Sequence, residues 1–301
     1  MPEQHHPHHQ DHHQSASAAH SPGYDDTAMA ELLDLDAEVL RSYLGEVTAW
    51  IGELTAARAP RRMLDLGSGT GAGAFALLER FAAAHVTAVD LSESNLRRLA
   101  EKSVTRGWES RVEVVQADLD ATWPAVGVID LVWASSSLHH LAHPDRVLDE
   151  VCAALRPGGL AVIAELNSFP RFLPDDIGIG RPGLEARCHA TLAAWTAAEV
   201  PLMGADWGSY LSRAGLCLEA ERRFVIDLTA PLPPSTGRYA QASLRRLRAG
   251  LDGQMNAEDL AVLDVLLDSD GPEGLIQRND LSVRAVRQVW VGRKPSAAEK
   301  G

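Results

Sequence analysis

The feature that most constrains this chain is a glycine-rich turn directly after a short apolar run. Met63 to Leu66 predict a buried strand, and the turn Gly67-Ser68-Gly69-Thr70-Gly71 follows it. Glycine lets the backbone approach a ligand closely because it has no Cβ. A helix that starts after such a turn points its unpaired N–H groups at the ligand. The segment therefore predicts a nucleotide-cofactor site.

A second predicted strand, His85 to Asp90, ends in a carboxylate that can accept both hydroxyls of a ribose. With Gly67-x-Gly69-x-x-Ala72, Asp90 formally satisfies the dinucleotide fingerprint. This fingerprint alone does not separate a nicotinamide dinucleotide from other cofactors that contain adenosine. The two strands together predict an adenosine-containing cofactor.

Three further features accompany the turn. Asp65 precedes it and can either order the turn or face a cationic group of the ligand. A third strand, Arg111 to Gln116, ends in Ala117-Asp118-Leu119, whose carboxylate can bind an adenine amine or cap the strand end. A fourth strand, Val128 to Ala134, leads into a helix that is predicted to stop at Leu155-Arg156-Pro157-Gly158-Gly159.

In this order the motifs resemble the class I S-adenosylmethionine-dependent methyltransferases. The run Ser135-Ser136-Ser137-Leu138-His139-His140-Leu141 is similar to the branch that includes the ubiquinone and menaquinone biosynthesis methyltransferases. The resemblance is close from Ala59 to Leu166 and continues in outline to Arg293. It implies an α/β fold with a Rossmann-like, doubly wound sheet of seven strands. The sheet is expected to be mostly parallel with an antiparallel last strand, and helical lid insertions are expected to accompany it.

The resemblance also implies a cofactor, S-adenosylmethionine, and roles for the motif residues. Asp90 would hold the ribose, Leu91 would pack on the adenine, and the backbone around Gly67 and Ala134 would hold the methionine end. The predicted cofactor-binding set is Asp65, Gly67, Ser68, Gly69, Thr70, Gly71, Asp90, Leu91, Ala117, Asp118, Leu119, Ala134 and Ser135.

Methyl transfer depends mainly on alignment of the two reactants, so few catalytic side chains are expected. His139 and His140 follow the fourth strand and are candidate bases, because imidazole titrates near neutral pH. They could instead cap or pack the following helix. Glu165 is a further candidate base, and a structural ion pair is its alternative role.

The candidate substrate-binding residues are Tyr24, Tyr43, His139 and Arg171. The fork of Arg171 suits a carboxylate or phosphate, but a surface position is equally compatible with the sequence.

The periodicity predicts further elements around these motifs. Helices are expected at Thr70 to Phe81 and at Ser92 to Lys102, with Ser92 as N-cap. Pro144 suits the first turn of a later helix, and Asn256 suits the cap of another. The fifth strand is expected at Leu160 to Leu166 and the seventh at Leu281 to Arg293.

The chain divides into three predicted parts. Residues 1–23 are a histidine-rich tail that is expected to be disordered and to bind metal incidentally, so no functional metal is predicted. Residues 24–58 are a helical cover, with one helical pattern from Asp26 to Ala56. Residues 59–301 are the methyltransferase domain, with helical insertions at about 167–206 and 229–280. The second insertion is expected to be either a substrate lid or a dimerisation element.

Charge and cysteine content restrict the partners. The net charge of −13 argues against a nucleic-acid backbone or an anionic membrane, so a small-molecule substrate is expected, and a homodimer is possible. Cys152, Cys188 and Cys217 form no close pair, which argues against a zinc site. The chain shows neither a membrane-spanning run nor a signal peptide, which predicts a cytoplasmic protein. A NAD-dependent oxidoreductase and a non-catalytic S-adenosylmethionine-binding regulator are the alternative functions.

Overall fold

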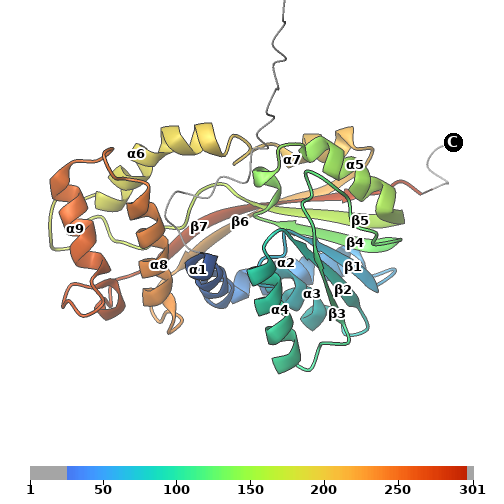
Figure 1. Cartoon of the computed structure of the whole chain (residues 1–301), viewed down its shortest axis with the longest axis horizontal. Coiled ribbons are helices and arrows are strands. Elements are labelled where there is room, and N and C mark those ends of the chain that lie inside the picture. Colours follow the sequence, from blue (N-terminus) through green and yellow to red (C-terminus); the bar gives the residue numbers. More distant parts are fainter. Residues whose placement is uncertain (1–25, 297–301) are drawn as a thin grey trace, which may run out of the picture.

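The computed structural model describes residues 26–296, and a seven-stranded sheet forms its centre (Figure 1). The strands are β1 (Arg62–Leu66), β2 (His85–Asp90), β3 (Val112–Gln116), β4 (Ile129–Ser135), β5 (Leu155–Leu166), β6 (Cys217–Leu228) and β7 (Val283–Arg293). Their order is β3-β2-β1-β4-β5-β7-β6. β7 runs antiparallel to both of its neighbours, β5 and β6, and the other pairs of neighbouring strands are parallel. This is the predicted Rossmann-like sheet with an antiparallel last strand.

Helices cover both faces of the sheet because the central strands are apolar on both sides. In β4, Leu131 and Trp133 join the core on one face, whereas Val132 and Ala134 join the core on the other. The first face is covered by α1 (Asp26–Val39), α2 (Arg41–Leu54) and α3 (Ala72–Arg80), and α4 (Glu93–Thr105) packs beside β2 and β3. The second face is covered by α5 (Pro144–Ala154) and α7 (Trp207–Arg213) (Figure 1).

Several helix starts follow the predicted local chemistry. The Ser92 hydroxyl accepts a hydrogen bond from the Asn95 amide at 3.3 Å, which makes Ser92 the N-cap of α4. Pro144 occupies the first turn of α5. The Asn256 side chain accepts from the Asp259 amide at 2.9 Å and so caps α9 (Ala257–Leu267). These caps are confirmed.

Other boundaries differ from the predictions. The first helical pattern is divided at the buried Leu40 into α1 and α2, and α3 starts at Ala72 because Gly71 takes a left-handed conformation with φ 91°. Helix α5 ends at Ala154, so the predicted helix stop is confirmed, but the residues from Leu155 to Gly159 already belong to β5. There the pairing with β4 is irregular between Ile129 and Leu131, and Gly158 has φ 73°. A left-handed glycine can mark an irregularity within a strand as well as a turn. The sequence prediction took Gly158 and Gly159 for a turn and therefore placed the start of this strand at Leu160, five residues too late.

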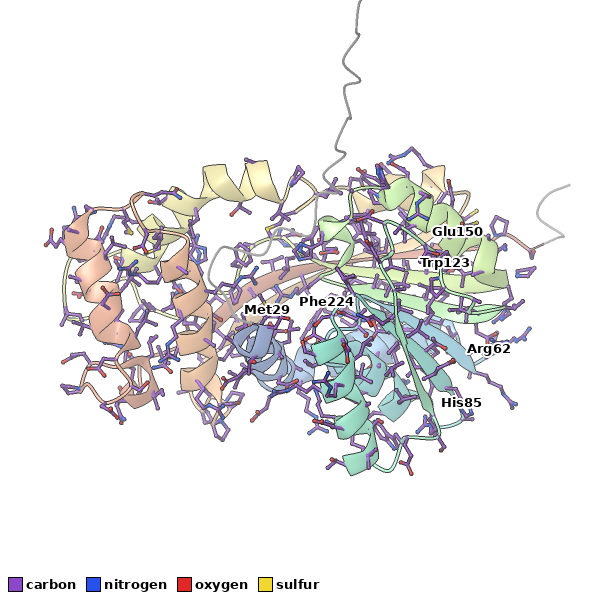
Figure 2. The ribbon with its side chains drawn as sticks, viewed as in Figure 1. Met29, Arg62, His85, Trp123, Glu150 and Phe224 are labelled. Carbon is purple, nitrogen blue, oxygen red and sulfur yellow. The ribbon has the colours of Figure 1, made fainter. Side chains whose placement is uncertain are left out.

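Two insertions follow the parallel part of the sheet. The first contains a loop and α6 (Leu184–Glu199), and the second contains α8 (Thr236–Ala249) and α9 between β6 and β7. They extend away from the edge marked in Figure 2 by Arg62 and His85, the first residues of β1 and β2. Their buried residues belong to the same core cluster as β4, β5 and β7. The domain limits themselves remain a prediction, and the histidine-rich tail and Tyr24 lie outside the described residues.

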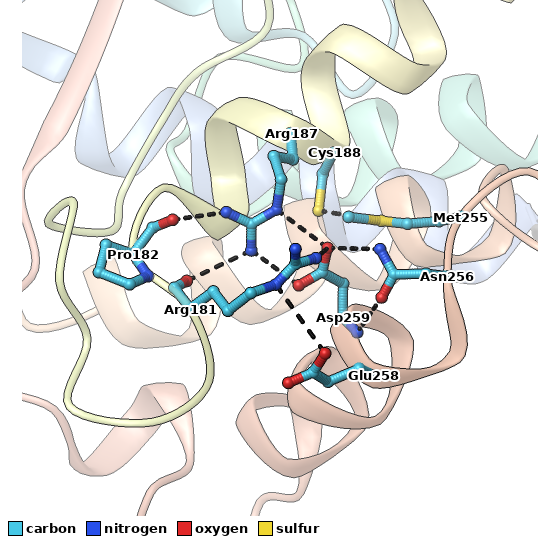
Figure 3. Close-up of polar contacts among 8 residues, drawn as sticks. All are labelled: Arg181, Pro182, Arg187, Cys188, Met255, Asn256, Glu258 and Asp259. Carbon is cyan, nitrogen blue, oxygen red and sulfur yellow. Dashed lines mark hydrogen bonds and ion pairs between the residues drawn. The ribbon is translucent and has the colours of Figure 1, made fainter.

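A polar cluster joins the two insertions (Figure 3). The carboxylate of Asp259 on α9 accepts hydrogen bonds from Arg187 on α6, at 2.7 and 2.9 Å, and from Arg181 at 2.9 Å. The Asp259 side chain is 1% exposed. Hydrogen bonds from Arg187 lower the pKa of Asp259 to about 2. We call Asp259, Arg181 and Arg187 the insertion latch.

Candidate active site

The glycine turn lies at the carboxyl ends of β1 and β4, where the strand order reverses. This is where an open α/β sheet binds its ligand. Gly67, Gly69 and Gly71 all have positive φ angles, of 64°, 51° and 91°. A Cβ on Gly67 would lie 2.4 Å from the Ser137 Cβ, so this position requires glycine. The Ser137 hydroxyl donates to the Leu66 carbonyl at 2.8 Å, which ties the segment after β4 to the turn.

Asp90 connects the turn to the end of β2. Its carboxylate accepts from the Gly69 amide at 2.7 Å and from the Ser92 amide at 2.8 Å. A carboxylate has about four acceptor positions, so further acceptor capacity remains for ribose hydroxyls. The geometry of Asp90 is therefore compatible with its predicted role.

Residues around Asp90 lie where an adenine ring is expected. Leu91 is a large apolar side chain with 50% of its surface exposed, next to Asp90. At the end of β3, Ala117 is partly buried, Asp118 is exposed and Leu119 is buried. The Asp118 carboxylate accepts from the Asp120 amide at 2.9 Å, so it closes a local turn as well. The Leu119 carbonyl accepts from Arg146. Ala134 and Ser135 end β4 on the same edge.

Three polar residues in the turn or directly beneath it are buried. Asp65 lies beneath it, where the Ala74 amide of α3 hydrogen-bonds to the carboxylate and its Oδ2 has no partner. Burial raises the pKa of Asp65 to about 7. The Ser68 hydroxyl is buried without a partner. The Thr70 hydroxyl donates to Asp34 on α1 at 2.6 Å, so its side chain faces α1.

Asp34 fastens α1 to the glycine turn. Besides Thr70, it accepts from Arg98 at 2.5 Å and from Lys102 at 2.7 Å, both on α4. Lys102 also donates to the Thr70 carbonyl at 2.7 Å. Burial alone would raise the pKa of Asp34, but Lys102, Thr70 and Arg98 lower it overall. We call Asp34 and these three partners the α1 clamp, which the sequence analysis missed because the residues are far apart in sequence.

His139 and Glu165 form a buried pair at the carboxyl ends of β4 and β5. His139 Nδ1 lies 2.5 Å from Glu165 Oε2, and both side chains are at most 3% exposed. Glu165 Oε1 also accepts from the Ser137 and Leu138 amides at 3.2 and 3.0 Å. His140 is exposed, and its ring lies 4.1 Å from that of His139. Two of the three candidate bases named from the sequence, His139 and Glu165, are thus one hydrogen-bonded unit.

A second polar cluster at the same edge of the sheet joins α1, α2, α8 and β7. Tyr239 on α8 donates to Asp36 Oδ1 on α1 at 2.5 Å, and Arg287 Nη2 on β7 lies 3.3 Å from the same oxygen. Tyr43, a candidate substrate-binding residue from the sequence, is buried, and its hydroxyl has no partner. Burial raises the pKa of Tyr43 above its ordinary value, and the charges of Arg287, Asp36 and Glu165 also act on it. We call Tyr43, Asp36, Tyr239 and Arg287 the acceptor cluster.

The sequence contained one signal for the acceptor cluster. In β7, Val283, Ala285, Val289 and Val291 occupy the alternating buried positions, and Arg287 stands in the same register. An arginine at an apolar position of a strand is a buried charge in need of a partner.

Arg171 does not lie in a buried site. Its side chain is exposed, and its backbone pairs with that of Arg284 in an isolated bridge. Burial lowers the pKa of nearby His189 to about 4, and the charge of Arg171 lowers it further. Among residues 26–296, no three His, Cys, Asp or Glu side chains are grouped to hold a metal ion, and no helix is long and apolar enough to span a membrane.

Comparisons with known proteins agree with this site. Residues 63–159, which hold the glycine turn, Asp90, Asp118 and His139, match a family described as a methyltransferase domain. A malonyl-[acyl-carrier protein] O-methyltransferase from Laribacter hongkongensis is 42% identical over 36% of this chain and 38% of its own length. A ubiquinone/menaquinone biosynthesis C-methyltransferase from Roseobacter denitrificans is 30% identical over 38% of this chain and 46% of its own.

A solved structure shows the same fold over more of the chain. A candidate methyltransferase from Bacillus halodurans superposes with a TM-score of 0.53 at 19% identity, covering 83% of this chain and 99% of that protein. The chain thus spans less than half the length of the two curated relatives and resembles the solved structure in fold. The predicted resemblance to the class I S-adenosylmethionine-dependent methyltransferases is confirmed.

Proposed function

We propose that this chain transfers a methyl group from S-adenosylmethionine to a small-molecule acceptor, with S-adenosylhomocysteine as product. The observation that carries the proposal is the placement of two sets of groups on one edge of the sheet. The glycine turn with Asp90 lies at the ends of β1 and β2, and the His139–Glu165 pair lies at the ends of β4 and β5. The match of residues 63–159 to a methyltransferase domain supports this assignment.

The residues of the turn fit the proposed cofactor. The exposed face of Leu91 suits an adenine ring, and Asp90 has acceptor capacity for the ribose hydroxyls. Asp65 Oδ2 and the Ser68 hydroxyl are buried polar atoms without partners near the proposed methionine end. When bound, the sulfonium supplies a methyl carbon that is already activated toward a nucleophile.

His139 and Glu165 can handle the proton of the acceptor. An ionised Glu165 carboxylate accepts from His139 Nδ1, and a neutral imidazole that donates from Nδ1 keeps the lone pair on Nε2. Nε2 is then able to accept a proton from a hydroxyl, amine or activated carbon. Such general base catalysis typically contributes about 10²–10⁴-fold to the rate. Orientation of the acceptor by neighbouring side chains contributes the larger share.

Titration calorimetry with S-adenosylhomocysteine and, separately, NAD tests the proposal. We expect saturable binding of S-adenosylhomocysteine and none of NAD. Asp90→Ala should weaken binding at least ten-fold, because a hydrogen bond to a charged group is worth about 1.5–3 kcal/mol. Asp90→Asn keeps one acceptor oxygen and should weaken it less. Glu93→Ala, an exposed carboxylate on α4, is the matched control and should leave affinity unchanged.

The result also separates the alternatives. Binding of NAD in place of S-adenosylhomocysteine would favour the NAD-dependent oxidoreductase and contradict the proposal. Binding of S-adenosylhomocysteine without methyl transfer to any acceptor would favour the non-catalytic regulator. Because the relatives are named as an O- and a C-methyltransferase, similarity does not single out the acceptor atom. The small-molecule acceptor, the cytoplasmic location and the homodimer remain predictions from composition and sequence pattern.

A further inference from the structure

Two hydrogen-bond donors of the acceptor cluster have no partner. In the described part of the chain, the Tyr43 hydroxyl and Arg287 Nη1 are buried side-chain atoms without any hydrogen bond. Arg287 is 4% exposed, and Tyr43 is 7% exposed. A buried donor that lost its water without gaining a protein partner costs free energy, so such atoms call for an explanation.

The two donors lie on the same face of the sheet. The Tyr43 ring on α2 contacts Phe224, and Phe224 on β6 is the cross-strand partner of Arg287 on β7. Arg287 pairs with Leu166, the last residue of β5, which directly follows Glu165. The donors therefore lie at the same edge of the sheet as the His139–Glu165 pair.

Asp36 does not satisfy this arginine. Its Oδ1 is engaged by the Tyr239 hydroxyl at 2.5 Å, and Arg287 Nη2 approaches the same oxygen at only 3.3 Å. The Asp36 side chain is also 37% exposed, so water shares its charge. A guanidinium has five N–H donors in a planar fork, and Nη1 of this fork has no hydrogen-bond partner.

The surroundings of the two donors are aromatic. The Tyr43 ring meets Phe224 edge-on with centroids 5.5 Å apart, and the Tyr239 ring meets Phe172 edge-on at 5.1 Å. A ligand that satisfies the donors therefore combines a planar group of acceptor oxygens with an apolar body.

We propose that Arg287 and Tyr43 bind a carboxylate of the acceptor molecule, which makes the substrate of the proposed methyltransferase an apolar carboxylic acid. The carboxylate matches the planar fork of Arg287, and the Tyr43 hydroxyl donates to it as well. Asp36 and Glu165 are the acidic groups whose negative charges act on the Tyr43 hydroxyl. Tyr239 occupies Asp36 Oδ1, and His139 occupies Glu165 Oε2. The inference rests on the proposed function and assigns to Arg287 the role that the sequence suggested for the exposed Arg171.

The test is calorimetric titration of the full chain, saturated with S-adenosylhomocysteine, with carboxylate probes and their neutral isosteres. Acetate and benzoate are compared with acetamide and benzamide at constant ionic strength. We expect saturable benzoate binding that is at least ten-fold tighter than benzamide binding, with acetate weaker than benzoate. Equal affinity for acid and amide, or no binding of either acid, would overturn the proposal. Inorganic phosphate that competes with benzoate and binds more tightly would also overturn it.

Two variants locate the binding to the donors. Tyr43→Phe removes only an unpaired hydroxyl, so it should keep or raise the melting temperature of the free protein while weakening benzoate about ten-fold. Arg287→Gln should abolish benzoate binding, and far-ultraviolet circular dichroism checks its fold. Tyr210→Phe on α7, on the opposite face of the sheet, is the matched control. Unchanged benzoate binding in Tyr43→Phe would contradict the assignment.

The titration with S-adenosylhomocysteine separates a failure of the proposed function from a failure of the acceptor assignment. If S-adenosylhomocysteine does not bind, the proposed function fails. If it binds normally and the carboxylate probes do not, only the acceptor assignment fails.

Discussion

Asp65 shows how a single buried carboxylate can shape the pH response of the protein. It lies beneath the glycine turn with 2% of its surface exposed, and only one of its oxygens is hydrogen-bonded. Burial raises its pKa to about 7, compared with an ordinary value near 4. The folded protein therefore holds a proton on Asp65 at a pH where the unfolded chain has released it.

We predict that Asp65→Asn removes part of the pH dependence of stability. A raised pKa gives a contribution that is complete below about pH 4 and is lost as the pH rises toward 7, at about 1.4 kcal/mol per pH unit. The free energy of unfolding of Asp65→Asn, relative to the wild type, should thus increase from pH 5 to pH 7 and level off above that. Urea denaturation at several pH values measures it. A constant difference between the two proteins would contradict the assigned pKa.

At the scale of elements, charged residues fasten the covering helices to the site. The α1 clamp joins α1 to α4 and to the glycine turn, and the insertion latch joins α6 to α9 (Figure 3). Asp259 is buried and Asp34 is partly buried, and each carboxylate has two cationic partners. Such pairs cost more when one partner is removed than isolated surface pairs do.

We expect Asp34→Asn to loosen α1 over the glycine turn. Thr70, Arg98 and Lys102 would lose a charged acceptor, and since both cations reach water, the loss of stability should be about 1 kcal/mol. Hydrogen exchange in α1 and in the turn should accelerate. Glu31→Gln, which breaks an exposed ion pair of the same helix with Arg238, should leave exchange unchanged. Equal effects of the two variants would argue against the clamp.

Asp259→Asn should weaken the protein at neutral pH but much less in acid. The Asp259 pKa of about 2 is lowered, so its contribution is present above about pH 4 and is lost as the pH falls toward 2. We predict a loss of about 2 kcal/mol at pH 7 that shrinks below pH 4. Thermal denaturation across this range measures it. Glu258→Gln, its exposed neighbour with a 3.9 Å contact to Arg181, is the control. A loss that does not depend on pH would contradict the role of the carboxylate.

For the whole molecule, the insertions and the sheet share one hydrophobic core. Phe172, Leu244 and Leu263 from the insertions belong to the same cluster as Leu131, Val162 and Val289 of the sheet. Extensive shared burial makes separate unfolding of the insertions unfavourable.

We therefore predict a single unfolding transition for residues 26–296. Circular dichroism and tryptophan fluorescence should give coincident melting curves. S-adenosylhomocysteine at about 100 times its dissociation constant should stabilise the whole unit by about 2.7 kcal/mol. An earlier transition confined to α8 and α9, seen by hydrogen exchange, would show that the second insertion is an independent unit.

The sequence predicted the sheet and the proposed cofactor site, formed by the glycine turn and Asp90, because both depend on local patterns. Strand β2 follows the prediction from His85 to Asp90, and the glycine turn needs only adjacent residues. The acceptor cluster was out of reach because it brings together Asp36, Tyr43, Tyr239 and Arg287 from four elements. The pairing of His139 with Glu165 was likewise missed, although both residues were named. Long-range side-chain contacts leave little trace in the periodicity of a single chain.

The position of β7 has a consequence for how the molecule is assembled during synthesis. Of the seven described strands, β7 is the last to leave the ribosome, yet it lies between β5 and β6. Until it emerges, β6 has no hydrogen-bonded partner in the sheet, and Arg287 cannot join Asp36 and Tyr239. The nascent chain can therefore form the glycine turn and Asp90 site first. Until β7 arrives, one side of β5 has no strand partner and stays open to solvent and to other chains. Completion of the proposed acceptor site coincides with closure of that edge, so a chain able to bind the acceptor is one whose sheet is already complete.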